Sequence, residues 1–227
     1  MTDRRLLVLG ATSGIGQEFA ESAKSSNQFC VVRGYGRQHF DVRDEEALLM
    51  AIQQVRPTDV VYSTGMNELD WVSDIHRMTF RALMEVNVWG FLSTIQTLQS
   101  QGCGPVNVVA ITSDAAWRPM RTSAVYCASK AALEMAVRVA SRELAPLGWR
   151  VNAVAPGKVE DTGMTAYVDQ RVMELRDWSL EAAEAYEIQS SPLGRKVTKR
   201  EVAEVIFAVL NGPSAQTGEI IAVNGGR

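Results

Sequence analysis

Short apolar runs alternate along the chain with longer segments in which apolar residues recur every three or four positions. A continuous apolar run of about four to eight residues is typical of a buried strand, whereas the longer spacing is typical of one helix face. Seven runs are interpreted as strands: Leu6–Leu9, Phe29–Val32, the weakly marked His39–Asp41, Asp59–Tyr62, Val106–Thr112, Arg150–Val154 and Glu219–Val223. Strands that alternate with helices favour parallel β-α units.

The helical spacing predicts helices between these strands. They cover Ile15–Ser25, Asp44–Val55, about Ile75–Ser100, Ser123–Leu147 and Thr198–Leu210. Asp44 is a typical helix-capping residue, and Pro57 follows the end of the same helix. The pattern therefore predicts one α/β domain over residues 1–227, with a doubly wound parallel sheet of about seven strands and helices on both faces.

One segment interrupts this alternation. Residues 158–196 are rich in Glu, Asp, Met, Tyr and Trp, and they stand where a simple β-α crossover would be expected. Long insertions in a compact domain commonly carry or cover a binding site. We predict that the segment Lys158–Lys196 is such a covering insertion.

Composition narrows the class of protein. The 227 residues are 46% hydrophobic and 22% charged, which is ordinary for a globular domain, and the net charge of -3 gives no sign of a nucleic-acid partner. The first apolar run is shorter than a signal-peptide core and far shorter than the ~20 residues of a membrane span. The three cysteines, Cys30, Cys103 and Cys127, are odd in number and lack Cys-x-x-Cys spacing. Free thiols in a cytoplasmic protein are the expected reading.

A glycine-rich stretch, Gly10-Ala11-Thr12-Ser13-Gly14-Ile15-Gly16, follows the first strand and opens the first helix. Glycines permit a tight turn and bring backbone N–H groups close to a pyrophosphate, which the helix N-terminus also favours. The spacing differs from the common dinucleotide fingerprint G-x-G-x-x-G, and a plain turn is the alternative. The strand-loop-helix context favours a dinucleotide site with contacts from Gly10, Thr12, Ser13, Gly14, Ile15 and Gly16.

A second signal combines Ser113, at the end of a strand, with Tyr126 and Lys130 on the following helix. The i, i+4 spacing places Tyr126 and Lys130 on one helix face. An ammonium group near a phenol lowers the phenol pKa from about 10, which suits proton transfer. Ser113 would lie at the ligand edge of a parallel sheet, where its hydroxyl can bind a carbonyl oxygen. Alone, a Tyr-x-x-x-Lys pair is more often a solvated helix face.

Together these motifs resemble the short-chain dehydrogenase/reductase family. That family pairs a G-x-x-x-G-x-G loop with a later Tyr-x-x-x-Lys and a serine thirteen positions before the tyrosine, the separation of Ser113 and Tyr126. The resemblance extends from Leu6 to Gly226. Further matching elements are Asp41-Val42, Val86-Asn87-Val88-Trp89-Gly90, Pro156-Gly157 and Asn224-Gly225-Gly226.

The resemblance implies a Rossmann-like oxidoreductase that transfers a hydride between NADP(H) or NAD(H) and a carbonyl or alcohol, without a catalytic metal. The implied catalytic residues are Asn87, Ser113, Tyr126 and Lys130. Tyr126 would donate or accept the proton, Lys130 would also bind the nicotinamide ribose, and Asn87 would hold a water. The implied cofactor contacts, besides the glycine loop, Tyr126 and Lys130, are Asp41, Val42, Gly65, Pro156, Gly157, Val159 and Thr162. Asn87 as a helix-bending amide and Asp41 as a strand end are the structural alternatives.

Some residues depart from the family pattern. Tyr62-Ser63-Thr64-Gly65 replaces its Asn-Asn-Ala-Gly, and Asp161 stands where the family has a threonine, so we expect Thr162 to take that role. The segment between the second and third strands is short enough to have lost a helix. These departures leave open a non-catalytic dinucleotide sensor or structural protein, and an epimerase or dehydratase on the same scaffold.

The end of the second strand indicates the cofactor. No acidic residue lies between Phe29 and Phe40 to bind ribose hydroxyls, whereas Arg33 and Arg37 do lie there. Guanidinium groups suit phosphate. The sequence therefore favours NADP(H), with NAD(H) as the alternative.

The substrate is much less defined by the sequence, because this fold serves many chemistries. Two roles are open for a set of large apolar side chains: they line an apolar substrate pocket beneath residues 158–196, or they pack in the core or the covering segment. The set is Trp117, Met120, Met164, Tyr167 and Trp178. Arg118 and Arg121 would attract an acidic substrate or carrier protein, or are simply solvated. By resemblance, the helices Met78–Ser100 and Ser123–Leu147 should pair two chains in a homodimer or homotetramer.

Overall fold

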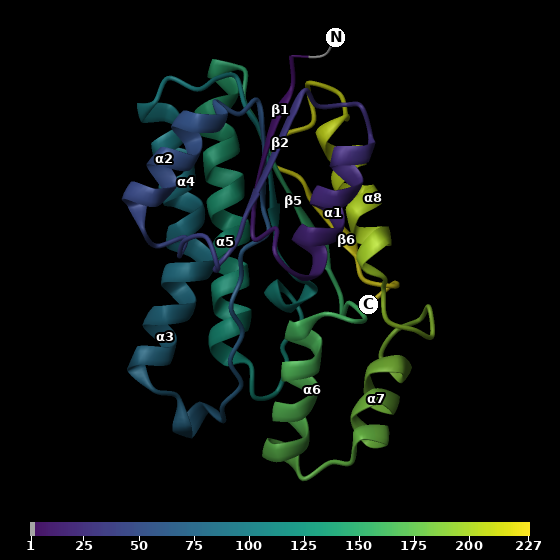
Figure 1. Ribbon diagram of the computed structural model, residues 1–227. Coiled ribbons are helices and arrows are strands. Elements are labelled where there is room, and N and C mark those ends of the chain that lie inside the picture. Colours follow the sequence, from purple (N-terminus) through teal and green to yellow (C-terminus); the bar gives the residue numbers. More distant parts are fainter. Residues whose placement is uncertain (1–2) are drawn as a thin grey trace.

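A six-stranded parallel sheet forms the centre of the computed structural model, which describes residues 3–227 (Figure 1). Its strands are β1 (Arg5–Leu9), β2 (Val31–Tyr35), β3 (Asp59–Tyr62), β4 (Asn107–Ile111), β5 (Arg150–Pro156) and β6 (Ile220–Val223). They lie in the order β2-β1-β3-β4-β5-β6, and every neighbouring pair is parallel. The predicted doubly wound α/β fold is confirmed.

Helices cover both faces of the sheet. One face carries α1 (Gly14–Ser25) and α8 (Lys199–Leu210), and the other carries α2 (Glu45–Val55), α4 (Gly90–Ser100) and α5 (Ala124–Leu144). The alternation of side chains along β1 shows why two layers form: Leu6 and Val8 pack into the α1–α8 core, whereas Leu7 and Leu9 pack into the other. Because successive strand residues point to opposite faces, a fully apolar strand needs a cover on each side.

The prediction of about seven strands is wrong, because His39–Asp41 is not a strand. Local hydrogen bonds hold this stretch in turns: His39 N donates to Gly36 O at 2.7 Å, and Asp44 N donates to Asp41 O at 2.8 Å. The Asp41 carboxylate also accepts from Arg43 N at 3.0 Å. Such Asp-backbone bonds compete with strand pairing. The connection from β2 to β3 holds only α2, whose predicted cap is confirmed by the bond from Ala47 N to Asp44 Oδ1.

The long helical stretch predicted over Ile75–Ser100 is divided. It contains α3 (Arg77–Met84), a π-helical turn over Glu85–Trp89, and α4. A π-turn inserts one extra residue into a helix and is frequent at functional sites. Here it contains Asn87, one of the predicted catalytic residues.

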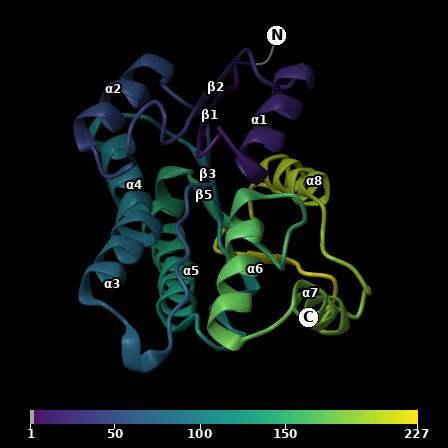
Figure 2. The ribbon, with the colours of Figure 1, turned by 60° about the horizontal axis from the view of Figure 1, so that its bottom comes forward.

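Residues 158–196 form two helices, α6 (Gly163–Arg176) and α7 (Leu180–Gln189). Both project past the carboxyl ends of the strands, and they come to the front when the molecule is tilted (Figure 2). Of the residues of α7, Ala183 alone is buried. No helix within residues 3–227 combines the length and apolarity needed to cross a membrane.

Candidate active site

A cavity of about 570 Å³ opens at the carboxyl ends of the strands. Segments that follow five strands line it: Gly10 and Thr12–Ile15 after β1, Gly36-Arg37 after β2, Ser63–Gly65 after β3, Thr112–Asp114 after β4, and Gly157–Val159 after β5. Residues of α5, α6 and α7 complete the wall. Ligands of open parallel sheets bind at this edge, and the volume is typical of a small-molecule site.

The glycine loop forms a backbone cradle in this cavity. Gly10 has a φ of +89°, and a Cβ there would lie 2.7 Å from the Ser63 backbone, so only glycine fits. A Cβ on Gly16 would collide with Gly10 O, because α1 leaves the strand at close range. The first turn of α1 therefore directs its N–H groups and its partial positive charge into the cavity. This cradle fits a pyrophosphate.

Ser113, Tyr126 and Lys130 form a second group in the cavity wall. All three line the cavity, and Lys130 is 3% exposed. The Ser113 hydroxyl lies near enough to the Tyr126 hydroxyl to lower its pKa. Lys130 Nζ donates to Ile111 O at 2.9 Å and lies 5.7 Å from the centre of the Tyr126 ring. The helical spacing and the end of β4 together assemble a hydroxyl, a phenol and an ammonium group.

Burial sets the pKa of both titratable members of this trio. Desolvation raises the pKa of Tyr126 to about 12, although the Ser113 hydrogen bond acts in the opposite direction. Desolvation likewise lowers the pKa of Lys130 to about 8, against the attraction of the nearby Glu134 carboxylate. The Tyr126 pKa is therefore raised, opposite to the predicted lowering, because desolvation is its largest cause. At neutral pH the phenol is protonated and the lysine is charged.

Asn87 is completely buried and acts as a brace. Its Oδ1 accepts from Met66 N at 2.7 Å, and its Nδ2 donates to Met66 O and to Ser129 Oγ, each at 2.9 Å. The side chain therefore fixes the loop after β3 against α5 and leaves no amide group free. The water-holding role implied by the resemblance stays a prediction.

The two arginines proposed for cofactor choice lie in different places. Arg37 follows β2 and lines the cavity, whereas Arg33 is an exposed residue inside β2 and does not line it. The reason is that β2 continues to Tyr35, three residues beyond its predicted end. Asp41 also lines the cavity, and its ion pair with Arg43 at 2.7 Å holds its pKa near 2.

Most other predicted contacts reach the cavity. Val42, Pro156, Val159 and Thr162 line it, whereas Asp161 does not. Thr162 also caps α6, where its Oγ1 accepts from Thr165 N at 3.0 Å. Among the candidate pocket residues, Met120 and Met164 line the cavity, but Trp117, Tyr167 and Trp178 do not. Arg118 is paired with Asp114 at 2.8 Å, and Arg121 lies 5.2 Å from the Trp71 ring.

Sequence reasoning missed five charged residues of the cavity wall: Arg43, Asp114, Lys158, Glu187 and Arg227. Arg43, Asp114 and Lys158 directly follow recognised motifs, and that adjacency was an available signal. Glu187 and Arg227 had none, because the folding of α7 against the end of β6 brings them there. Within residues 3–227, no three His, Cys, Asp or Glu side chains are grouped as metal ligands.

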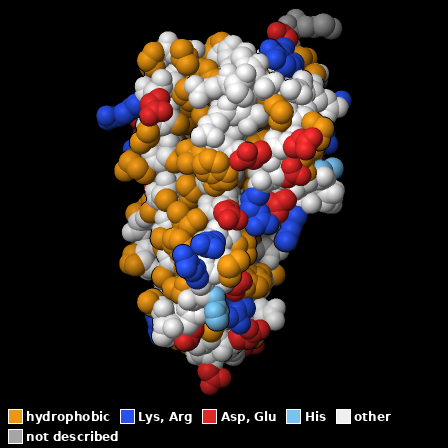
Figure 3. Space-filling model, turned by 90° about the vertical axis from the view of Figure 1, so that its left-hand side faces the viewer, with side chains coloured by type: hydrophobic (Ala, Val, Ile, Leu, Met, Phe, Trp, Pro, Cys, Tyr) orange, Lys and Arg blue, Asp and Glu red, His pale blue; other side chains and the backbone are white. Residues whose placement is uncertain are grey.

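The face that carries α3, α4 and α5 exposes large apolar side chains, which gather in patches on the surface (Figure 3). They include Met78, Phe80, Trp89, Met135 and Val139. Scattered apolar residues are normal, but contiguous patches favour a protein partner. Pairing of two chains through this face stays a prediction.

Comparisons with known proteins agree with this geometry. A family model described as enoyl-(acyl carrier protein) reductase matches residues 10–227. An uncharacterized oxidoreductase of Methylorubrum extorquens is 33% identical over 182 residues, which are 78% of this chain and 68% of that protein. The L-tagatose-forming galactitol 2-dehydrogenase of Cereibacter sphaeroides is 32% identical over 196 residues, which are 82% of this chain and 73% of that protein.

Among solved structures, a variant of the actinorhodin polyketide ketoreductase with NADPH is similar with a TM-score of 0.87 and 26% identity. The match covers 99% of this chain and 98% of the other. The glycine cradle, the Ser113-Tyr126-Lys130 cluster and these matches lead to one assignment. The chain belongs to the short-chain dehydrogenase/reductase family of nicotinamide-dependent oxidoreductases.

Proposed function

We propose that this protein transfers a hydride between NADP(H) and a carbonyl or alcohol substrate, with Tyr126 as the general acid or base. The observation that carries the proposal is that Ser113, Tyr126 and Lys130 line the same cavity as the glycine cradle. Hydride transfer and proton transfer to one carbonyl group require the dinucleotide site and the proton donor in one cavity. The cradle binds the dinucleotide, and the cluster handles the proton.

Each residue has a defined task in carbonyl reduction. The bound cofactor supplies the hydride. Tyr126, which is protonated at neutral pH, donates its proton to the substrate oxygen as negative charge develops there. Ser113 holds that oxygen by a hydrogen bond. Lys130, charged below a pKa of about 8, stabilises the phenolate that remains. Alcohol oxidation uses the same groups in reverse.

A non-catalytic binding role accounts for less of the structure. A sensor needs the cradle, but it has no need for a lysine that is 3% exposed beside a buried phenol. Burying an ammonium group that has only one partly buried carboxylate nearby costs folding free energy. Such costs are concentrated at sites where the group acts in chemistry.

The direct test follows NADPH and NADH absorbance with purified protein across a panel of ketones, aldehydes and sugars. We expect oxidation of the reduced cofactor with at least one carbonyl class, and the reverse change with the matching alcohol. Tight cofactor binding without turnover on any carbonyl would instead support the sensor reading.

Cofactor preference is tested by replacing Arg37 with alanine. Arg37 lines the cavity beside the glycine loop, where a guanidinium group would pair with a 2′-phosphate. We expect Arg37→Ala to raise the KM for NADPH by about tenfold, the loss of a charge-assisted contact, with little change for NADH. Arg33→Ala is the matched control, because this exposed arginine lies two positions before the end of the same strand. Equal effects on both cofactors, or a native preference for NADH, would remove the NADP(H) assignment.

A further inference from the structure

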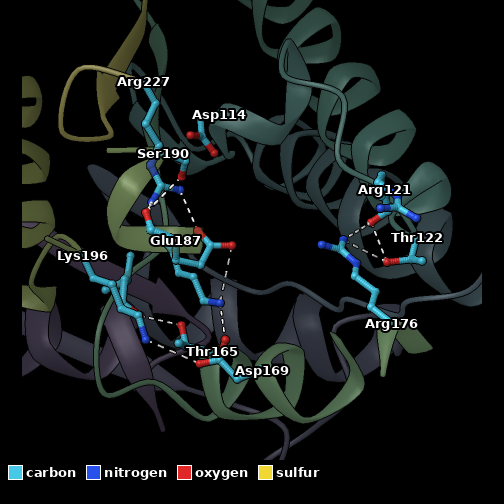
Figure 4. A network of polar contacts seen from close by, with 12 residues as sticks. Asp114, Arg121, Thr122, Thr165, Asp169, Arg176, Glu187, Ser190, Lys196 and Arg227 are labelled. Atoms are coloured by element: carbon cyan, nitrogen blue, oxygen red, sulfur yellow. Dashed lines mark hydrogen bonds and ion pairs between the residues drawn. The ribbon is translucent and has the colours of Figure 1, made fainter. Parts of the chain in front are cut away.

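A second cluster of charged residues lies on the cavity wall next to the proposed proton-transfer group. Arg227 Nη1 pairs with Glu187 Oε2 at 2.9 Å, and Lys158 Nζ lies 3.7 Å from Glu187 Oε1. Lys158 also pairs with Asp169, which lies 3.5 Å from Lys196 Nζ. Figure 4 shows Arg227 directed at Glu187, with Asp114 beside them. Asp114 follows Ser113 directly, so the cluster begins at the reacting centre.

The positive and negative charges come from different parts of the fold. Lys158 follows β5, and its backbone oxygen accepts from Val197 N at 3.1 Å. Arg227 follows β6, and its backbone oxygen accepts from Asn224 Nδ2 at 2.8 Å. Both cations are therefore anchored at the edge of the sheet. The carboxylates of Asp169 and Glu187, in contrast, belong to α6 and α7.

The helix that supplies Glu187 is weakly held. Ala183 is its buried residue, whereas Leu180, Tyr186 and Ile188 are exposed. A segment with so little buried apolar surface opens at low free-energy cost compared with the core. When α7 moves away, the side chain of Arg227, 5% exposed, loses its carboxylate partner, and Lys158 loses one of two.

The carboxylates that remain do not compensate for these cations. Asp114 is already paired with Arg118 at 2.8 Å, and Asp169 is shared between Lys158 and Lys196. Without Glu187, the three cations Lys158, Lys196 and Arg227 therefore share one carboxylate, which leaves an excess of two positive charges. A buried charge without a partner is costly, so such a site favours a ligand that brings a negative group.

We propose that Lys158 and Arg227 form a subsite for an anionic group of the substrate, a carboxylate or phosphate at some distance from the reacting carbonyl. Glu187 occupies this subsite as an internal competitor. The proposal rests on the proposed function, since it names the substrate class of the same cavity. It excludes a substrate recognised only by apolar contacts.

The test compares charged and neutral carbonyl compounds of similar shape. The pairs are 4-oxopentanoate with its methyl ester, and dihydroxyacetone phosphate with dihydroxyacetone, so the two arms separate a carboxylate from a phosphate preference. For the wild-type protein we expect kcat/KM to be at least tenfold higher for the charged member of one pair. Equal or lower kcat/KM for the charged member of both pairs would overturn the proposal.

Two variants are expected to change the ratio of charged to neutral kcat/KM in opposite directions, which distinguishes recognition of the anionic group from structural support. Lys158→Gln should lower the ratio of charged to neutral kcat/KM by about tenfold, whereas Glu187→Gln should raise it several-fold by removing the competitor. Lys196→Gln is the matched control, because Lys196 pairs with Asp169 but does not line the cavity. A merely structural cluster would give a ratio unchanged by both variants, and that result would overturn the proposal.

Thermal stability distinguishes this subsite from the proposed chemistry. The charged compounds should raise the Tm of the wild-type protein and of Lys196→Gln, but not that of Lys158→Gln. If the Tm rises in this pattern while no carbonyl is reduced, the subsite holds and the proposed hydride transfer fails. If neutral carbonyls are reduced and the charged ones neither bind nor react, hydride transfer holds and the subsite fails.

Discussion

Replacement of Tyr126 by phenylalanine is expected to lower kcat by two to four orders of magnitude, roughly the usual contribution of a positioned general acid or base. The phenol of Tyr126 lines the cavity beside Ser113, whereas the ammonium group of Lys130 donates to the Ile111 carbonyl. The hydride step then leaves a charged oxygen that nothing protonates.

Cofactor binding should survive this change. The ring of Tyr126 is buried among apolar side chains of its own cluster, and phenylalanine keeps that volume. The dissociation constant of NADPH, measured by fluorescence titration, should change by less than about threefold, a small effect on the free-energy scale of binding. Stopped-flow measurement of NADPH oxidation gives kcat on the best carbonyl of the panel.

The control for this experiment is Tyr186→Phe. Tyr186 is an exposed tyrosine of α7, its ring lies 5.3 Å from the Trp178 ring, and it does not line the cavity. It should retain wild-type turnover. If Tyr126→Phe kept near-normal turnover as well, the proton would have to come from another group, and the central role of Tyr126 would be wrong.

The fold was largely predictable because burial on two faces leaves a strong pattern. Runs such as Leu6–Leu9 and Val108–Ile111 are apolar at every position, as a strand covered on both sides must be. His39–Asp41 shows where this reasoning fails: its hydrogen bonds are local, made by Asp41 and Gly36 within a few residues. The π-turn at Asn87 was not predictable either, since one extra residue in a helix does not alter the apolar spacing enough to be seen.

The site was predictable only where its residues lie close to one another in the sequence. The i, i+4 spacing of Tyr126 and Lys130 and the glycine loop are local features, and the cavity contains both. The ion pairs of Glu187 with Lys158 and Arg227 join three separate elements, so no spacing along the sequence signals them. The direction of the Tyr126 pKa also depended on burial, which the sequence pattern does not measure.

Replacement of Lys130 by methionine should give a protein that is inactive yet more stable at neutral pH. Burial lowers the pKa of Lys130 from 10.5 to about 8, so the folded state binds this proton less tightly than the unfolded state does. At about 1.4 kcal/mol per pKa unit, the charged lysine costs the folded protein about 3 kcal/mol below pH 8. Loss of the bond to Ile111 O offsets about 1 kcal/mol of that gain. We expect a net stabilisation of about 2 kcal/mol at pH 7.

The pH dependence identifies the cause of this stabilisation. The cost of the buried charge is fully present below pH 8 and disappears as the pH rises from the folded pKa, about 8, to the unfolded pKa of 10.5. The advantage of Lys130→Met in urea unfolding should therefore shrink between pH 7 and pH 10, while kcat stays at least 100-fold below wild type, the scale of a lost catalytic charge. Lys24→Met, an exposed residue of α1, should change stability by no more than about 0.5 kcal/mol. An inactive variant that is also less stable at pH 7 would show that Lys130 supports the fold. A residue that is retained for its chemistry at a cost in folding free energy should instead leave the protein more stable when it is replaced.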